Sequence, residues 1–131
     1  MNNIESTLKG AKKAEWSYPR LFEALKQAGV SSYEVFLESY DAIYQGNFES
    51  WKEPAPEGFK PLIIAKVFNK EAVLKALKER QNNLTSFVTF LEDMAKAGVK
   101  HYQVDMAQAK VTYYGENDQD YYSEFVPPFQ N

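Results

Sequence analysis

The sequence predicts an α+β domain in which helices pack on an antiparallel sheet. Some segments carry apolar residues at spacings of three and four, as amphipathic helices do, and others alternate apolar and polar residues, as half-buried strands do. There is also an internal repeat, because Ala-Gly-Val-x-x-Tyr-x-Val begins at Ala28 and again at Ala97. A chain of 131 residues has the usual size of one domain, so we expect a single domain over residues 1–131.

Two helices are expected before residue 29. Leu8 lies in the first helical pattern, and Ser17 is a suitable N-cap for the second helix. Pro19 falls in the first turn of that helix, where a missing N–H costs nothing. Its apolar stripe consists of Tyr18, Leu21, Phe22, Leu25 and Ala28. Gly29 supplies the left-handed residue that commonly ends a helix, so we interpret it as a structural cap.

The pattern changes to a period of two after this glycine. Tyr33, Val35 and Leu37 alternate with polar residues, which predicts a strand with one buried face. A second short strand is expected around residues 43–44, and a turn follows at Gly46.

A connector and a strand are expected over about residues 51–68. The segment EPAPEGFKP contains three prolines and predicts the connector. The next segment, LIIAKVF, is rich in β-branched residues, which predicts a buried strand.

The second half repeats the order of the first. Asn69 is expected to cap a third helix, and Thr85 or Ser86 a fourth, which Gly98 closes. Three strands are expected around residues 102–106, 111–114 and 121–125, the last two joined by the polar turn GENDQD.

The two halves correspond at one constant offset, which carries Gly29 onto Gly98 without a gap. Between segments 17–35 and 86–104, seven of nineteen positions are identical, where average residue usage gives roughly one. We therefore predict an internal duplication of a helix-helix-strand-strand unit, with repeat one at about 3–50 and repeat two at about 69–126. Two copies of such a unit would pack about a pseudo-twofold axis.

Composition disfavours some classes of function and excludes others. The net charge of −3 and pI of about 5.2 do not suit nucleic-acid binding, which needs a basic surface. The absence of Cys excludes disulfides, cysteine zinc sites and a cysteine nucleophile. No motif for a cofactor is present, so none is expected. With no signal-like or membrane-spanning segment, we expect a cytoplasmic protein without membrane contact.

His101, the only histidine, is a candidate general base. If Tyr102 and Val104 face the core, His101, Gln103 and Asp105 face outward together. Asp105 would lie roughly 13 Å away along the strand, too far to orient the imidazole. The pattern therefore favours a histidine on an exposed strand face over a catalytic one.

The acidic residues near the last turn suggest a calcium loop at first sight. These residues are Glu116, Asp118, Asp120 and Glu124. The central glycine and the closing glutamate of an EF-hand are both missing, so the pattern favours a solvated hairpin tip, and no metal is expected.

Tyrosine is concentrated in the predicted strands. Tyr113-Tyr114 and Tyr121-Tyr122 flank one hairpin, so on each strand one ring should face the core and its neighbour should face outward. Aromatic residues suit strands in general, but an exposed tyrosine-rich surface is also typical of interfaces. Tyr114, Tyr122 and His101 are our predicted ligand or partner surface.

The second repeat resembles a known family. The motif Phe87-x-x-x-Leu91-x-x-Met94-x-x-Ala97-Gly98-Val99, then Tyr102, Asp105 and Tyr113-Tyr114, is similar to the YdfO-like, prophage-associated proteins of unknown function. The resemblance extends to Trp16-x-x-x-x-Leu21 in the first repeat. It implies an α+β fold and transfers no activity or catalytic residue. Members are often labelled "phage envelope protein", but nothing in this sequence suits a lipid envelope.

The sequence favours a non-enzymatic binding or interaction module with an aromatic-rich surface or an inter-repeat groove. Its partner would be a protein or a small molecule, and the same surface would suit self-association as a homodimer. One alternative is a small enzyme that uses His101 with tyrosine and carboxylate groups, which requires a deep pocket. A phage or prophage accessory structural protein is the other.

Overall fold

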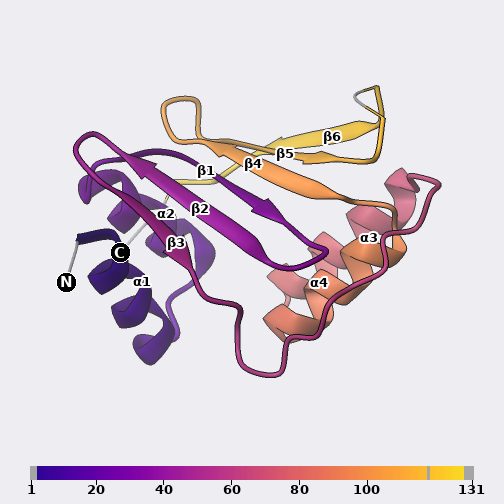
Figure 1. Cartoon of the computed structure of the whole chain (residues 1–131), viewed down its shortest axis with the longest axis horizontal. Coiled ribbons are helices and arrows are strands. Elements are labelled where there is room, and N and C mark those ends of the chain that lie inside the picture. Colours follow the sequence, from indigo (N-terminus) through magenta and orange to yellow (C-terminus); the bar gives the residue numbers. More distant parts are fainter. Residues whose placement is uncertain (1–2, 118, 129–131) are drawn as a thin grey trace.

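A computed structural model describes residues 3–117 and 119–128 of the chain. This part contains four helices and one six-stranded antiparallel sheet, which confirms the predicted α+β class (Figure 1). The first half contains α1 (Asn3–Ala14), α2 (Tyr18–Gln27), β1 (Val30–Phe36), β2 (Asp41–Gly46) and β3 (Ser50–Glu53). The second half contains α3 (Lys70–Gln81), α4 (Phe87–Lys96), β4 (His101–Asp105), β5 (Lys110–Tyr114) and β6 (Tyr121–Phe125).

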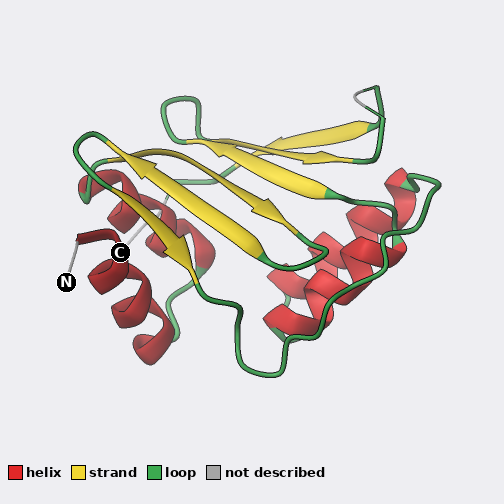
Figure 2. Cartoon of the chain, viewed as in Figure 1, coloured by secondary structure: helices red, strands yellow, loops and turns green. Residues whose placement is uncertain are grey.

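The two halves meet in the middle of the sheet. The strand order is β3-β2-β1-β4-β5-β6, so β1 pairs with β4 across the junction. Both helix pairs lie on the same side of the sheet (Figures 1 and 2). Helices α1 and α2 contact β3 and β1, and α3 contacts β6. None of the helices in the described part of the chain combines the length and apolar character that a membrane span requires.

The β1–β4 junction is symmetric with respect to the two halves. Glu34 lies opposite Gln103, its own equivalent, at the centre of the paired segment. Leu37 N–H donates to Lys100 C=O at 3.0 Å, and the equivalent Met106 N–H donates to Ser31 C=O at 3.1 Å. A twofold axis between β1 and β4, at Glu34 and Gln103, accounts for this symmetric pairing. The duplication itself remains a prediction from the sequence.

The local signals for the helices correspond to specific contacts. Asn69 Oδ1 accepts from Ala72 N–H at 3.1 Å at the start of α3, and Ser86 Oγ accepts from Thr89 N–H at 3.1 Å at the start of α4. Ser17 precedes α2 without a side-chain cap bond. Gly29 and Gly98 follow α2 and α4 with φ of +93° and +89°, the left-handed conformation expected of them.

The predicted strand LIIAKVF is wrong. This segment is an extended connector, and the side chain of Ile63 is 92% exposed, whereas Leu62 and Ile64 pack against the core. Its backbone hydrogen bonds are made with two separate segments of the chain: Leu62 N–H donates to Glu38 C=O, and Ala65 N–H donates to Ala95 C=O. A short β-branched run cannot distinguish a ladder strand from a segment that covers the core. The first half instead has β3, which precedes the connector and was not predicted.

Candidate functional site

The two faces of the sheet differ because side chains alternate along each strand. Tyr33 and Val35 of β1 are buried, whereas Ser32 and Glu34 point to the opposite face of the sheet. The described helices all lie on one side of the sheet and leave this opposite face uncovered (Figure 2). We call this the open face. Its side chains on the five strands β2, β1, β4, β5 and β6 are Asp41, Ile43, Gln45, Ser32, Glu34, Phe36, His101, Gln103, Asp105, Lys110, Thr112, Tyr114, Tyr121, Ser123 and Phe125.

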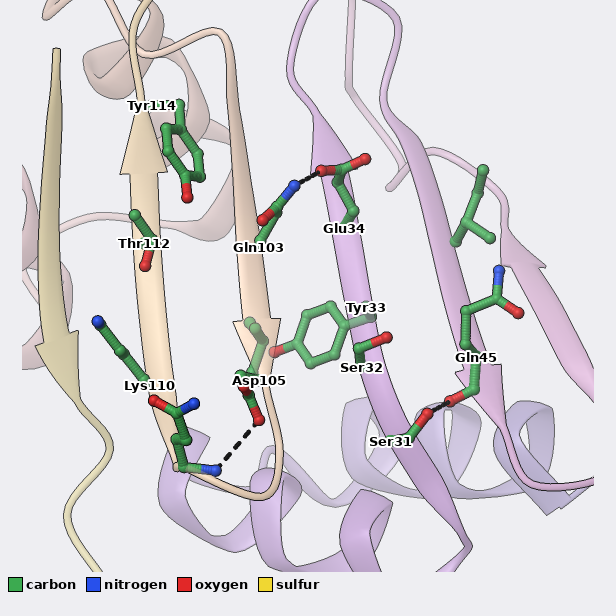
Figure 3. A pocket seen from close by; sticks show the side chains of 13 residues that line it. Ser31, Ser32, Tyr33, Glu34, Gln45, Gln103, Asp105, Lys110, Thr112 and Tyr114 are labelled. Carbon is green, nitrogen blue, oxygen red and sulfur yellow. Dashed lines mark hydrogen bonds between the residues drawn. The ribbon is translucent and has the colours of Figure 1, made fainter. Parts of the chain in front are cut away.

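A shallow trough of about 690 Å³ lies on the open face, over the junction of the two halves. Its floor comes from β2, β1, β4 and β5, and most of the residues that line it carry polar side chains (Figure 3). At its centre Gln103 Nε2 donates to a carboxylate oxygen of Glu34. Lys110 and Asp105 lie on neighbouring strands at one end, and Tyr114 lies at the other (Figure 3). The trough therefore offers charges of both signs, amides and the ring of Tyr114 to a ligand.

An aromatic row crosses the open face beside the trough. Phe36, His101, Tyr114 and Tyr121 lie at matching positions on β1, β4, β5 and β6. The ring centroids of Phe36 and His101 are 4.9 Å apart and stacked, as are those of His101 and Tyr114. Tyr114 and Tyr121 follow at 6.2 Å. The row is a continuous surface on which a flat or ring-shaped group could stack.

His101 is enclosed within this row. Its side chain is 19% exposed, and its Nδ1 lies 3.3 Å from Glu34 Oε2 without hydrogen-bond geometry to any described residue. Asp105 Oδ1 accepts from Gln108 N–H at 3.1 Å. Glu34 is the carboxylate nearest the imidazole in this arrangement, and sequence reasoning missed it. The signal available for it was the repeat, since a twofold axis through the sheet places equivalents such as 34 and 103 opposite each other.

The structure brings together two of the three residues predicted for the surface. His101 and Tyr114 are neighbours on the open face, and Tyr114 lines the trough whereas His101 lies outside it. Tyr122 lies on the helix side of the sheet, where the Lys70 ammonium is 5.6 Å from its ring centroid. Its neighbour Tyr121 occupies the open face instead. One ring of each pair does face outward, as expected, but on β6 it is the first and not the second.

Most other tyrosine hydroxyls lie in the core beneath the sheet. Tyr18 and Tyr33 share a hydrogen bond between their hydroxyls. Burial raises the pKa of Tyr18 to about 12 and holds the pKa of Tyr33 well above its usual value. Tyr40 and Tyr44 hydroxyls donate to Glu53 Oε1 at 2.7 and 3.3 Å. These groups stay protonated near neutral pH, so we interpret them as structural.

Acidic residues do not assemble into a metal centre in the described part of the chain. Residues 3–117 and 119–128 contain no group of three His, Asp or Glu side chains that could hold an ion. Glu116 and Asp120 lie at the β5–β6 turn, whereas Glu124 lies in β6 on the helix side. Asp118, the fourth residue of the acidic set, lies outside the described residues.

Comparison with known proteins gives a family but no activity. A model of a family described as proteins of unknown function, DUF1398, matches residues 7–125. Uncharacterized proteins of Mycobacterium bovis and Mycobacterium tuberculosis are 32% identical to the chain over 113 residues, which is 83% of this chain. The match covers 66% of those relatives, so the chain spans slightly less than two thirds of their length.

Proposed function

The chain belongs to the DUF1398 family, whose function is unknown, and we propose that it is a non-enzymatic binding module whose ligand lies on the open face. One observation carries this proposal: an aromatic row lies beside a polar trough, over the junction of the two halves. The ligand that suits this surface is a small polar molecule with a ring. The ring would stack on Tyr114, while Gln103, Asp105 and Thr112 would hydrogen-bond its polar groups.

The experiment begins with native mass spectrometry of the purified protein, which reports any co-purified small molecule. A panel of monosaccharides, nucleosides and aromatic amino acids is then titrated while the imidazole proton signals are followed by NMR. Because His101 is the only histidine, its signals are unambiguous. We expect one class of the panel to shift them in a saturable way. If no compound shifts them and nothing co-purifies, the small-ligand proposal fails and a protein partner must be sought.

Tyr114→Leu is expected to weaken binding of the panel compound about tenfold, because stacking on an aromatic ring contributes on the order of 1 kcal/mol. Tyr122→Leu is the matched control, since it alters the same residue type on the helix side and should leave the dissociation constant unchanged. Both constants are measured by the NMR titration, with thermal unfolding to verify the fold. Equal effects of the two substitutions would contradict a site on the open face.

A second candidate function is catalysis by His101, which the proximity of Glu34 favours. A carboxylate beside Nδ1 can hold an imidazole with Nε2 in position to act as a base. His101 lines neither of the two best-formed pockets of the described residues, which argues against this candidate. A screen with chromogenic ester and phosphate substrates tests it. A turnover that His101→Asn abolishes and Tyr122→Leu preserves would establish an enzyme.

The proposal also includes an internal duplication of the chain and a prophage-associated, cytoplasmic context for the protein. The β1–β4 junction pairs Glu34 with its equivalent Gln103 and arranges the other paired residues symmetrically about them, which supports a duplication, with the repeats at about 3–50 and 69–126 inside one domain. We also keep the resemblance to YdfO-like, prophage-associated proteins and a cytoplasmic location as part of the proposal. An accessory role in a phage particle predicts large assemblies, which sedimentation velocity would detect.

A further inference from the structure

Strand β6 forms one edge of the sheet, and its hydrogen-bonding pattern shows which groups face outward. Gly115 N–H donates to Asp120 C=O at 2.8 Å, and Val126 N–H donates to Ala109 C=O at 2.8 Å, on either side of the β5–β6 ladder. In an antiparallel pair such bonds recur at every second residue. Tyr122 and Glu124 therefore bond to β5. The N–H and C=O groups of Tyr121, Ser123 and Phe125 face the free edge.

The two edge strands, β3 and β6, differ in the features that hinder a further strand from pairing with them. Native sheets protect free edges with lysine, proline and short strands. By the same alternation the outward positions of β3 are Ser50 and Lys52, and Pro54 directly follows this four-residue strand. Strand β6 contains no lysine, and Pro127 and Pro128 come only after Val126, beyond the outward groups of Tyr121, Ser123 and Phe125. The strand exposes 55% of Tyr121 and 71% of Phe125. The β6 edge thus has the properties of an interaction surface.

We propose that the β6 edge pairs antiparallel with β6 of a second copy of the chain, about a twofold axis at Ser123. In this register Ser123 lies opposite the partner's Ser123, and Tyr121 lies opposite the partner's Phe125. All three residues have outward backbone groups, so every free N–H on the edge obtains a carbonyl acceptor. The exposed Tyr121 and Phe125 side chains become cross-strand aromatic pairs, one on each side of the axis.

Charge distinguishes this register from its neighbours. A twofold axis at Glu124 would place two glutamates directly opposite each other, and an axis at Tyr122 would place Asp120 opposite the partner's Glu124. Like charges in these positions destabilise a strand pair. The axis at Ser123 instead places Glu124 opposite the partner's Tyr122. The dimer would join two sheets edge to edge and extend each aromatic row from Tyr121 to the partner's Phe125.

A disulfide test reads out this register directly. The chain has no cysteine, so Ser123→Cys introduces a unique thiol. Directly opposite residues in a hydrogen-bonded antiparallel pair have Cα atoms about 5.5 Å apart, within the range of a disulfide. We expect oxidised glutathione to convert this variant to a covalent dimer on a non-reducing gel. Lys52→Cys on the β3 edge is the matched control and should form no covalent dimer on the same gel.

A charge-exchange test measures the same contact without a covalent bond. Tyr121→Lys is expected to raise the dimer dissociation constant at least tenfold by sedimentation equilibrium, because the lysine would face the partner's Phe125. Adding Phe125→Glu should restore the dimer, since each lysine then faces a glutamate. Both positions are exposed, and circular dichroism verifies the fold. A monomeric wild type, equal cross-linking of both cysteine variants, or failure of the double variant to recover would overturn the proposal.

Discussion

Replacing Gly98 by alanine is expected to destabilise the fold by about 3 kcal/mol, from backbone strain and overpacking together. Gly98 has φ of +89°, a conformation that costs an L-residue roughly 1–2 kcal/mol. A Cβ atom at this position would lie 2.4 Å from Val67 C=O oxygen and 2.8 Å from Phe68 Cα. Both contacts are with backbone, so the connector itself must move, and overpacking of this kind adds about 1–3 kcal/mol. Urea unfolding should therefore show a much lower midpoint.

Gly29→Ala is the matched control for this prediction. Gly29 ends α2 as Gly98 ends α4, and its φ of +93° carries the same backbone cost. A Cβ atom there would meet only Asn47 Nδ2, at an ordinary contact distance of 3.7 Å. We expect a loss of about 1–2 kcal/mol from the backbone conformation alone. Equal losses at the two sites would show that the connector does not pack against α4 as described.

These two glycines show that a local sequence pattern predicts a helix cap but not a contact with a distant segment of the chain. A glycine after an amphipathic stripe predicts a helix cap, because the cap depends on a few neighbouring residues. The extra constraint at Gly98 comes from Val67 and Phe68, which lie far earlier in the chain, before α3. It arises because the connector crosses the end of α4, where Asn69 N–H donates to Ala97 C=O at 2.8 Å. Nothing local to Gly98 encodes that crossing.

In the candidate site, too, the local pattern predicts which residues of one strand share a face but not which residues of other strands lie beside them. Alternation along one strand was enough to place His101, Gln103 and Asp105 on a common face. The rings that enclose His101 come from β1 and β5, and the register between strands decides which rings these are. In β6 the alternation of side chains can place either Tyr121 or Tyr122 on the open face. The pairing of β6 with β5 decides between them, because Tyr121 lies opposite Tyr114. The prediction that Tyr122 lies on the open face is wrong because the sequence of β6 alone does not determine which of the two tyrosines faces outward.

Glu53→Ala is expected to cost about 2 kcal/mol near neutral pH, whereas Glu53→Gln should not destabilise the protein. The Tyr40 and Tyr44 hydroxyls both donate to Glu53 Oε1, and alanine would leave them without this acceptor. A buried polar group without its partner costs about 1–3 kcal/mol. Glutamine keeps an acceptor oxygen at the same position and carries no charge to desolvate, so the two hydrogen bonds survive the substitution.

The pH dependence of the free energy of unfolding distinguishes the effect of the Glu53 charge from the effect of the hydrogen bonds that Glu53 accepts. Burial raises the pKa of Glu53 above its ordinary value of 4.5, and this effect outweighs the hydrogen bonds from the tyrosines, which lower the pKa. The folded state therefore holds the proton to higher pH than the unfolded state. Stability from this group is fully present below pH 4.5 and is lost as the pH rises through the raised pKa. Glu53→Gln removes this loss, so its advantage over the wild type in urea unfolding should be larger at pH 7 than at pH 4.5. A difference between the two proteins that is the same at both pH values would mean that the carboxylate is not desolvated in the folded protein.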